Sequence, residues 1–387
     1  MRIRAVEAAW LRVPLPAAKQ HVSDFGRIEA FDGVLVTIRT DDGLVGHGEA
    51  KAGVGSAGDC AALQAILTRE FAPRLIGADA REITRIGQTL GSGVRAPLAE
   101  RCARTMPILG RRGVHAAAIA GVDLALWDLA GKAHGCSVLE LVGGKCRDRV
   151  RAYASGGWAD AAGIGAQLAG YVAQGFGAVK MRVGAMDGGV AASVARVRAA
   201  RAALGPDVEL MVDAHGTMSV PEAKAFCAAV AGCGLRFVEE PVTSADREGL
   251  AEVRATSTTP IAAGESECTR HDFAELIGRR AVDVLQPDLA IASGFSEGLG
   301  IAALAAAHRL ELAPHCWGSA ISFRAGLTLA FASPAGAWME VPMGGAPLLR
   351  DLAPLDLALD DGGLAPPDGP GWGVAPDPEF VARWTQR

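Results

Sequence analysis

The chain has 387 residues, of which 50% are hydrophobic and 21% charged, a composition typical of a globular protein with enough apolar material for a core. Its net charge of −5 at pH 7 and the absence of a Lys/Arg block argue against nucleic acid as a partner, and no apolar run reaches the ~20 residues of a membrane helix. The eight cysteines show no CxxC spacing, which indicates reduced thiols of a cytoplasmic protein rather than a disulfide framework or a zinc site.

The first part of the chain predicts an antiparallel sheet followed by helices. Strands are expected in IRAVEAAWLRVPL, FDGVLVTIRTDD and LVGHGEAKAG, with a hairpin turn at residues 41–43. The polar loop AAKQHVSDFGRIEA between the first two strands is long for a plain connection, and such loops are often functional lids. Residues 60–140 have a helical period, clearest in AAIAGVDLALWDLAGKAHG.

After Gly144 short apolar strands alternate with alanine-rich helical stretches. Eight such strands begin near residues 150, 178, 208, 235, 260, 282, 310 and 337. Alternation at this spacing predicts βαβ units and an α/β fold, and eight units in ~200 residues suit a closed (β/α)8 barrel. The last 35 residues, rich in Pro and Gly, are expected to return to the N-terminal sheet.

Three carboxylates fall at the outgoing ends of successive predicted strands. Asp213, Glu239 and Glu265 are separated by 26 residues each, one βα unit apiece. Strand ends of a parallel barrel share one rim, where three carboxylates would repel one another unless a cation neutralised them. Oxygen ligands with positions left for substrate suit Mg²⁺. A single strand-end carboxylate is more often a helix N-cap, but three in register indicate a metal site.

The stretch GAVKMRVG places two cations on one face of a strand. Successive side chains alternate, so Lys180 and Arg182 share the face opposite to Val179 and Met181, which are suited to packing against helices. The cations therefore point toward the carboxylate rim. The alternative is that either one forms an ordinary ion pair there.

The next two strands supply Asp288 and His315, 27 residues apart. An aspartate bonded to one imidazole nitrogen fixes the tautomer and favours protonation at the other nitrogen, which is how a general base is built. The eighth strand ends in Glu340, for which two roles stay open. It could hydrogen-bond a substrate oxyanion if protonated, or it could be structural.

The stretch GVDLALWDLAGKAHGCSVLELVGGKCRDRVRAYASGG, the K-x-R strand, the D…EEP…GE carboxylates and the D…H dyad together resemble the mandelate racemase and muconate lactonising group of the enolase superfamily. The resemblance spans essentially the whole chain. It implies a modified TIM (β/α)8 barrel with an α+β N-terminal capping domain completed by the C-terminal tail. The domains are expected at residues 1–125, 126–350 and 351–387.

The resemblance also implies a reaction: abstraction of the proton alpha to a substrate carboxylate, with Mg²⁺ bound by Asp213, Glu239 and Glu265. Lys180 and Arg182 would then face the metal-bound carboxylate and stabilise the enolate. Mandelate racemase has lysine at both cation positions and uses the second as a base. Arginine is not deprotonated in proteins under ordinary conditions, so racemisation by two bases is disfavoured.

A second departure from mandelate racemase points toward elimination. MVDAHGTMSVPEAK carries His215 where mandelate racemase has asparagine, and it is similar to the D-x-H-G stretch of galactonate-type acid-sugar dehydratases, whose histidine is the general acid. Two residues along a strand, His215 would share the face of Asp213. It could protonate a leaving beta-hydroxyl while His315 takes the alpha proton; otherwise it only hydrogen-bonds substrate or a neighbour.

The sequence therefore predicts a Mg²⁺-dependent dehydratase that converts an aldonic or aldaric acid to its 2-keto-3-deoxy product. The first alternative is a racemase or epimerase of a 2-hydroxy acid that uses Lys180 or His215 opposite His315. The others are muconate-type cycloisomerisation, which the sixth strand disfavours because it offers Asp288 and no lysine, and a sugar-acid binding protein without turnover. Specificity is expected in two loops, 19–30 and 51–59, with His21 and Trp317 as candidate substrate contacts. The partners implied are a small carboxylate substrate and further copies of the chain.

Overall fold

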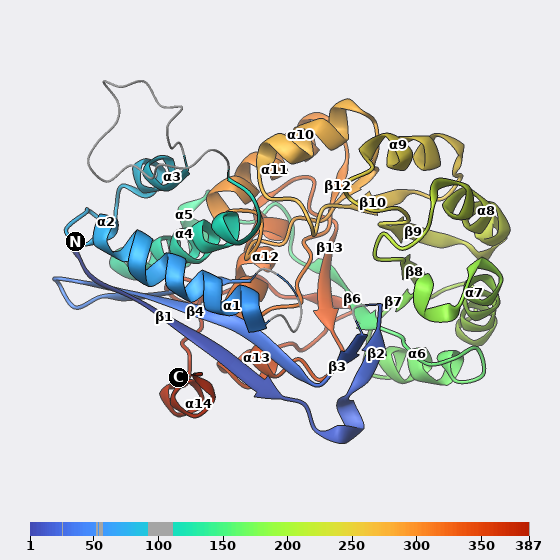
Figure 1. Ribbon diagram of the computed structural model, residues 1–387, viewed down its shortest axis with the longest axis horizontal. Coiled ribbons are helices and arrows are strands. Elements are labelled where there is room, and N and C mark those ends of the chain that lie inside the picture. Colours follow the sequence, from blue (N-terminus) through green and yellow to red (C-terminus); the bar gives the residue numbers. More distant parts are fainter. Residues whose placement is uncertain (25, 52, 54–56, 92–110, 387) are drawn as a thin grey trace.

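The computed structural model describes residues 1–24, 26–51, 53, 57–91 and 111–386, and comprises an N-terminal antiparallel sheet with helices beside a barrel (Figure 1). The N-terminal sheet has the order β1-β4-β5, from β1 (Ile3–Pro14), β4 (Ala30–Thr40) and β5 (Val45–Ala50). These are the three predicted strands. The β4–β5 turn contains Gly43 at φ +87°, a conformation that glycine adopts without steric strain.

Helix α4 (Gly113–His134) packs across this sheet. It can approach β5 closely because the strand presents glycine: a Cβ added to Gly48 would stand 2.0 Å from the Gly121 carbonyl oxygen. By length and apolar composition α4 could cross a membrane, but 72% of its most apolar window is buried inside the protein, as in the core helix of a globular domain. The shorter helices of this part are α1 (Ala57–Ala65), α2 (Ala72–Leu75) and α3 (Ile83–Gly91).

The polar loop between β1 and β4 forms a small hairpin of β2 (His21–Ser23) and β3 (Gly26–Ile28). Its turn residue Asp24 lies at the barrel, where Oδ1 accepts a hydrogen bond from the backbone N–H of Met186 at 2.9 Å. Residue 25 of this loop lies outside the described residues, as do 52 and 54–56 of the second predicted specificity loop.

Eight parallel strands form the barrel sheet in the order β12-β11-β10-β9-β8-β7-β6-β13. Leu312 of β12 pairs with Gly336, just ahead of β13, so the sheet nearly closes on itself and the predicted barrel is confirmed. The strands are β6 (Val150–Gly156), β7 (Ala178–Arg182), β8 (Glu209–Asp213), β9 (Leu235–Glu239), β10 (Ile261–Ala263), β11 (Val284–Leu285), β12 (Glu311–Leu312) and β13 (Trp338–Pro342).

Helices follow the strands and cover the outside of the barrel (Figure 1). They are α6 (Ile164–Val172), α7 (Val190–Leu204), α8 (Val220–Val230), α9 (Arg247–Thr256), α10 (Arg270–Gly278), α11 (Phe295–Ala307) and α12 (Ala320–Ala332), with the short α5 (Val138–Leu141) and α13 (Pro347–Arg350) before and after the barrel. Val179, Met181 and Val183 face these helices in the main core, as the alternation in GAVKMRVG predicts.

The interior of the barrel is layered. A separate apolar cluster takes residues from around the barrel: Tyr153, Ala178, Met211, Phe237, Ala262, Val284, Ala313 and Trp338. Because strand side chains alternate, the residue two positions later on each strand also points inward, one layer closer to the C-terminal rim. That next layer is polar and includes Lys180, Asp213, Glu239, His315 and Glu340. The apolar cluster therefore forms the layer of the barrel interior directly beneath the candidate site.

The C-terminal segment returns to the N-terminal sheet. Strand β14 (Gly363–Leu364) first pairs antiparallel with β6, and Trp372 then packs under α4 and donates from Nε1 to the Leu124 carbonyl at 3.0 Å. After α14 (Pro378–Trp384), Gln386 N–H donates to the Trp10 carbonyl of β1 at 2.8 Å. The tail therefore completes the N-terminal domain. The predicted boundary at 125/126 lies within α4, and the domain boundaries stay predictions.

Candidate active site

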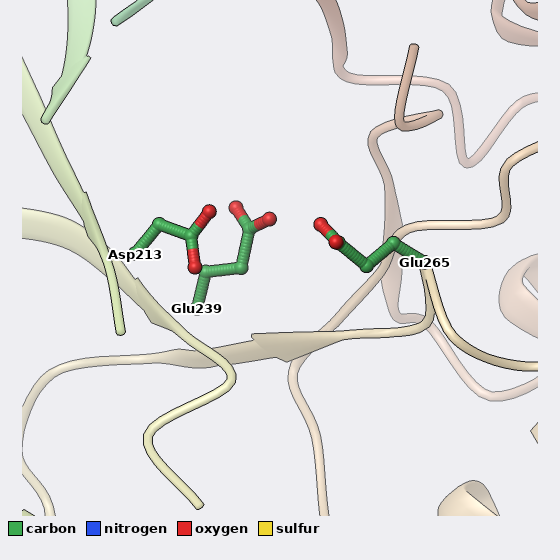
Figure 2. A group of neighbouring side chains, drawn as sticks. All are labelled: Asp213, Glu239 and Glu265. Carbon is green, nitrogen blue, oxygen red and sulfur yellow. The ribbon is translucent and has the colours of Figure 1, made fainter. Parts of the chain in front are cut away.

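The three predicted metal ligands lie together at the C-terminal rim. Asp213 and Glu239 are cross-strand partners at the ends of β8 and β9, and Glu265 follows β10 by two residues. One carboxylate oxygen from each lies within 4.8 Å of the other two. Figure 2 shows Glu265 pointing across the gap toward the other two carboxylates.

The carboxylate oxygens of this triad fit a divalent cation. Glu239 Oε1 is buried and, within the described residues, has no hydrogen-bond partner. Asp213 Oδ2 and Glu265 Oε2 are buried too, and in the described part of the chain they face side-chain nitrogens of the cations and imidazoles around the triad. Buried polar atoms are nearly always hydrogen-bonded unless an ion or water satisfies them. An all-oxygen set of carboxylates is the donor chemistry of Mg²⁺.

Lys180 lies beneath the triad with a fully buried side chain. Its Nζ is 2.7 Å from Glu239 Oε2, 2.8 Å from Glu340 Oε1 and 3.7 Å from Asp213 Oδ2. Burial alone would lower the pKa of Lys180, but Glu239 and Glu340 outweigh it and hold that pKa above its usual range. Lys180 is therefore a fixed cation in this arrangement.

Arg182 is the second cation, one layer further out. It is the cross-strand partner of Asp213, and its Nη1 forms an ion pair with Asp213 Oδ2. Its guanidinium also lies 5.6 Å from the centre of the Trp317 ring. The two predicted cations thus both reach the ligands, from the strand on which the sequence placed them.

The predicted base dyad is formed. His315 Nδ1 lies 2.8 Å from Asp288 Oδ2, and because a carboxylate only accepts, this nitrogen carries the proton. His315 Nε2 faces the triad, 3.3 Å from Glu265 Oε2. Burial lowers the pKa of His315, but Glu265, Glu340 and Asp288 raise it by more, so the net shift is upward.

His215 also reaches the triad, but from a turn rather than from the strand. Strand β8 ends at Asp213, and His215 has φ +46°, so the strand alternation used to place it does not apply. Its backbone N–H donates to Asp213 Oδ1 at 2.9 Å, and its Nε2 lies 3.4 Å from Asp213 Oδ2. Its Nδ1 lies 2.8 Å from Asp24 Oδ2 of the β2–β3 hairpin. Burial and the charge of Arg182 lower the pKa of His215, against the effect of Asp24.

Glu340 is tied into the site as an acceptor. Besides its pair with Lys180, it accepts from the Cys316 backbone N–H at 2.9 Å and from Trp317 Nε1 at 3.2 Å. Burial opposes its ionisation, but Lys180, His315 and Arg182 outweigh burial and hold the pKa of Glu340 below its usual range. Of the two roles left open, this arrangement favours an ionised, structural carboxylate over a protonated donor.

The candidate substrate contacts His21 and Trp317 both contact Trp158. His21 stacks on Trp158 with ring centres 4.1 Å apart, and Trp158 meets Trp317 edge-on at 5.9 Å. A cavity of about 630 Å³ opens beside this cluster, lined by His21, Val22, Asp24, Gly26, Trp158, Ala159, Gln167, Ala185 and Met186. The first predicted specificity loop therefore lines a cavity next to the site.

Four further residues touch or support the site and were not named from the sequence. Gln286 donates to Glu239 Oε2 at 2.7 Å and follows β11, so its place two residues after the inward-facing Val284 could have revealed it. Asp24 and Lys51 lie in the two predicted specificity loops, and Glu49 precedes the second loop; no motif in the sequence pairs these residues with particular partners on the barrel.

Comparison with known proteins gives a consistent assignment. The mandelate racemase/muconate lactonizing enzyme N-terminal domain matches residues 5–143, and the enolase C-terminal domain-like family matches residues 163–380. The chain is 35% identical to D-galactarolactone cycloisomerase from Agrobacterium fabrum over 88% of each chain. It is 37% identical to D-galactonate dehydratase from Ralstonia nicotianae over 90% of each.

A solved structure agrees at the level of the fold. A racemase from Streptomyces coelicolor A3(2) with bound magnesium has a TM-score of 0.86 and 30% identity, covering 99% of this chain and 100% of that one.

Proposed function

Because the chain belongs to the mandelate racemase/muconate lactonizing enzyme family of the enolase superfamily, we propose that it is a Mg²⁺-dependent dehydratase of an aldonic or aldaric acid. That the chain is an enzyme of the lyase class is confirmed by its D-galactonate dehydratase relatives. The sugar acid, the metal and the roles of the residues are the proposal.

One observation carries it: two imidazoles flank a single acidic triad, and each is held by its own aspartate. His315 Nε2 lies at Glu265, and His215 Nε2 lies at Asp213. Elimination of water needs a base at the alpha carbon and an acid at the beta oxygen. The site offers one imidazole for each task, at different ends of the triad.

The chain's own groups would divide the reaction as follows. Mg²⁺, held by Asp213, Glu239 and Glu265, would supply positive charge to the substrate carboxylate and the enolate. Lys180 and Arg182, which are fixed before the reaction, add to that stabilisation without having to reorganise.

The proton transfers follow from the two imidazoles. His315 Nε2 accepts the alpha proton as the C–H bond breaks. His215 then donates its Nε2 proton to the beta-hydroxyl, the C–O bond breaks, and water leaves. The resulting enol takes a proton at C3 and becomes the 2-keto-3-deoxy acid. Asp24 stabilises the charged form of His215 before the transfer, and the burial that lowers its pKa makes the imidazolium a stronger donor.

A racemase or epimerase remains the first alternative, and it needs a second base facing His315. Lys180 is held as a cation by Glu239 and Glu340, and arginine at 182 is not a base at ordinary pH. Neither residue of β7 therefore favours racemisation or epimerisation. His215 is the remaining candidate for the second base, since its Nε2 lies at Asp213 while that of His315 lies at Glu265.

Cycloisomerisation of a sugar-acid lactone is favoured by a separate observation, the 35% identity to D-galactarolactone cycloisomerase. Such a reaction would use the same alpha-proton abstraction but eliminate a ring oxygen, so its product would be an isomer and no water would be lost. Product mass therefore distinguishes the two.

The test is purified protein with Mg²⁺ and a panel of aldonic acids, aldaric acids and their lactones, with 2-keto acid detected by semicarbazide. We expect at least one acid to give a product lighter by one water. His315→Asn should lower that turnover by at least about a hundredfold, and full turnover in this variant would show that the assigned base is wrong. Binding of Mg²⁺ with no turnover on the whole panel would favour the binding-protein alternative. A cytoplasmic location and assembly as a homo-oligomer stay predictions.

A further inference from the structure

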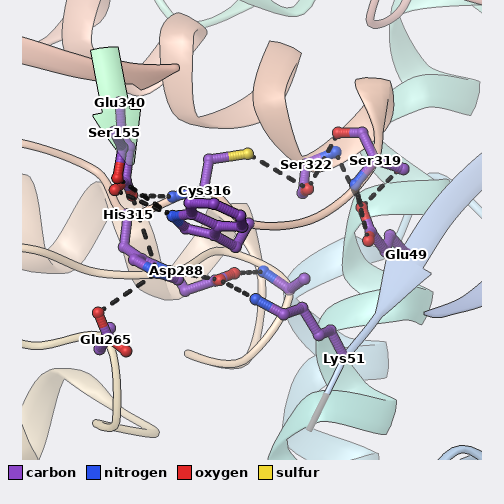
Figure 3. Close-up of polar contacts among 12 residues, drawn as sticks. Glu49, Lys51, Ser155, Glu265, Asp288, His315, Cys316, Ser319, Ser322 and Glu340 are labelled. Atoms are coloured by element: carbon purple, nitrogen blue, oxygen red, sulfur yellow. Dashed lines mark hydrogen bonds and ion pairs between the residues drawn. The ribbon is translucent and has the colours of Figure 1, made fainter. Parts of the chain in front are cut away.

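A lysine of the N-terminal domain reaches the base dyad of the barrel. Lys51 follows directly on β5, and only 3% of its side chain is exposed. Its Nζ lies 3.3 Å from Asp288 Oδ2, the same oxygen that accepts from His315 Nδ1 (Figure 3). The two residues are 237 positions apart in the chain.

The backbone reinforces this contact. Lys51 N–H donates to the Ala290 carbonyl at 3.2 Å, and Ala290 N–H donates to Asp288 Oδ1 at 2.8 Å. Asp288 is therefore held on both oxygens: Oδ1 by a backbone amide, and Oδ2 by His315 and Lys51. Rotation of the carboxylate would break several of these contacts together.

Glu49, two residues earlier, holds the segment that follows His315. It accepts from the backbone N–H of Ser319 at 2.9 Å, from Ser319 Oγ at 2.6 Å and from the Ser322 N–H at 3.3 Å, all at the start of α12 (Figure 3). Glycine at 318 permits this approach, because a Cβ there would lie 2.7 Å from Glu49 Oε1. The residues at the end of β5 therefore contact both the segment that follows His315 and Asp288, the hydrogen-bond partner of His315.

The positive charge of Lys51 is neutralised by the buried carboxylate of Asp288. A buried ammonium is tolerated only when it is paired. Burial lowers the pKa of Lys51, but Asp288, Glu265 and Glu49 raise it by more, so the side chain stays a cation. In return it supplies positive charge to a carboxylate that would otherwise lie buried among other acids.

We propose that Lys51 is a positioning residue of the base: it fixes the carboxylate of Asp288 and, through it, the ring of His315, so that the N-terminal domain completes a dyad whose two members both lie on the barrel. This inference rests on the proposed role of His315 as the base. It adds that the base is correctly oriented only when the N-terminal domain is seated on the barrel.

The test uses Lys51→Met, which keeps the length of the side chain without its charge, and Lys51→Arg, which keeps the charge. The matched control is Lys132→Met, since Lys132 also pairs with a buried aspartate of the N-terminal domain, Asp128 at 2.6 Å, away from the dyad. The first readout is the imidazole N–H resonance of His315 in ¹⁵N-histidine-labelled protein at one fixed pH, assigned by its loss in His315→Asn. We expect Lys51→Met to shift or broaden it and Lys132→Met to leave it unchanged.

The second readout is turnover of a substrate found in the panel. Loss of a residue that orients a functional side chain by bonding to its partner typically lowers activity by about 10- to 100-fold. We expect a fall of that size in kcat for Lys51→Met with KM within about threefold, and recovery of most of it in Lys51→Arg.

The outcomes separate this inference from the proposed function. If no acid is turned over by the wild type while Lys51→Met still moves the His315 resonance, the proposed function fails and the positioning role stands. An unmoved resonance, or a kcat within twofold of wild type, overturns the positioning role. Failure of both Lys51→Met and Lys51→Gln to fold would show that Lys51 serves stability instead, and would also overturn it.

Discussion

The metal site is tested by replacing Glu265 with glutamine, which keeps the size of the side chain and removes its charge. Mg²⁺ that binds only the native state stabilises it by about 2.7 kcal/mol at a hundredfold excess over its Kd. The entropy of unfolding is about 2.1 cal/mol/K per residue, so a chain of 387 residues has roughly 0.8 kcal/mol/K. Saturating Mg²⁺ should therefore raise the Tm of the wild type by about 3 °C.

In Glu265→Gln the same Mg²⁺ addition should raise the Tm by less than about 1 °C, because a neutral amide replaces one of three charged ligands. Calorimetry with and without Mg²⁺ measures both increments. The control is Glu267→Gln, which removes a buried carboxylate two residues away that pairs with Arg247 instead of the triad. An equal Mg²⁺ increment in Glu265→Gln and wild type would refute the triad as the metal site.

Three further predictions concern histidines. His315→Asn should lower kcat on an identified substrate by about 10²- to 10⁴-fold, the usual contribution of a general base, while the Mg²⁺-induced rise in Tm is kept. Asp24→Ala should lower kcat by about tenfold, because the His215 imidazolium that donates the Nε2 proton loses the carboxylate that stabilises it at Nδ1; an unchanged kcat would remove the hairpin from the mechanism. Burial and the charge of Lys132 lower the pKa of His47 to about 4, below the 6.5 of an unfolded histidine, so the unfolded state binds more protons between these values and stability falls as the pH drops from 6.5 to 4. In His47→Gln the free energy of unfolding, measured with urea, should fall less between pH 6.5 and pH 4, by up to roughly 3 kcal/mol at pH 4. A pH dependence equal to that of the wild type would contradict the lowered pKa of His47.

The barrel and its ligand rim could be predicted because both depend on short-range regularities. Alternation along β7 places Lys180 and Arg182 inward and Val179 outward, and the structure has them so. The spacing of one βα unit brings Asp213 and Glu239 into register as cross-strand partners. These relations need only the period of the strand and the parallel order of the sheet.

The sequence predicted that loops 19–30 and 51–59 of the N-terminal domain face the site, but not their individual contacts, because these depend on how two parts of the chain dock. Asp24 meets His215 across 191 residues, and Lys51 meets Asp288 across 237. No local pattern encodes such a pairing. His215 was placed on the right side of the site by strand alternation, yet the structure puts it in a turn with positive φ, where its position depends on Asp213 and Asp24 instead.

The most direct measurement is proton NMR of the reaction in D₂O with Mg²⁺ and the acid that the panel identifies. A base at the alpha carbon and an acid at the beta oxygen predict a 2-keto product with one deuterium at C3, and recovered substrate of unchanged configuration at C2. Deuterium at C2 of an inverted acid, with no keto product, would contradict dehydration and establish epimerisation in its place.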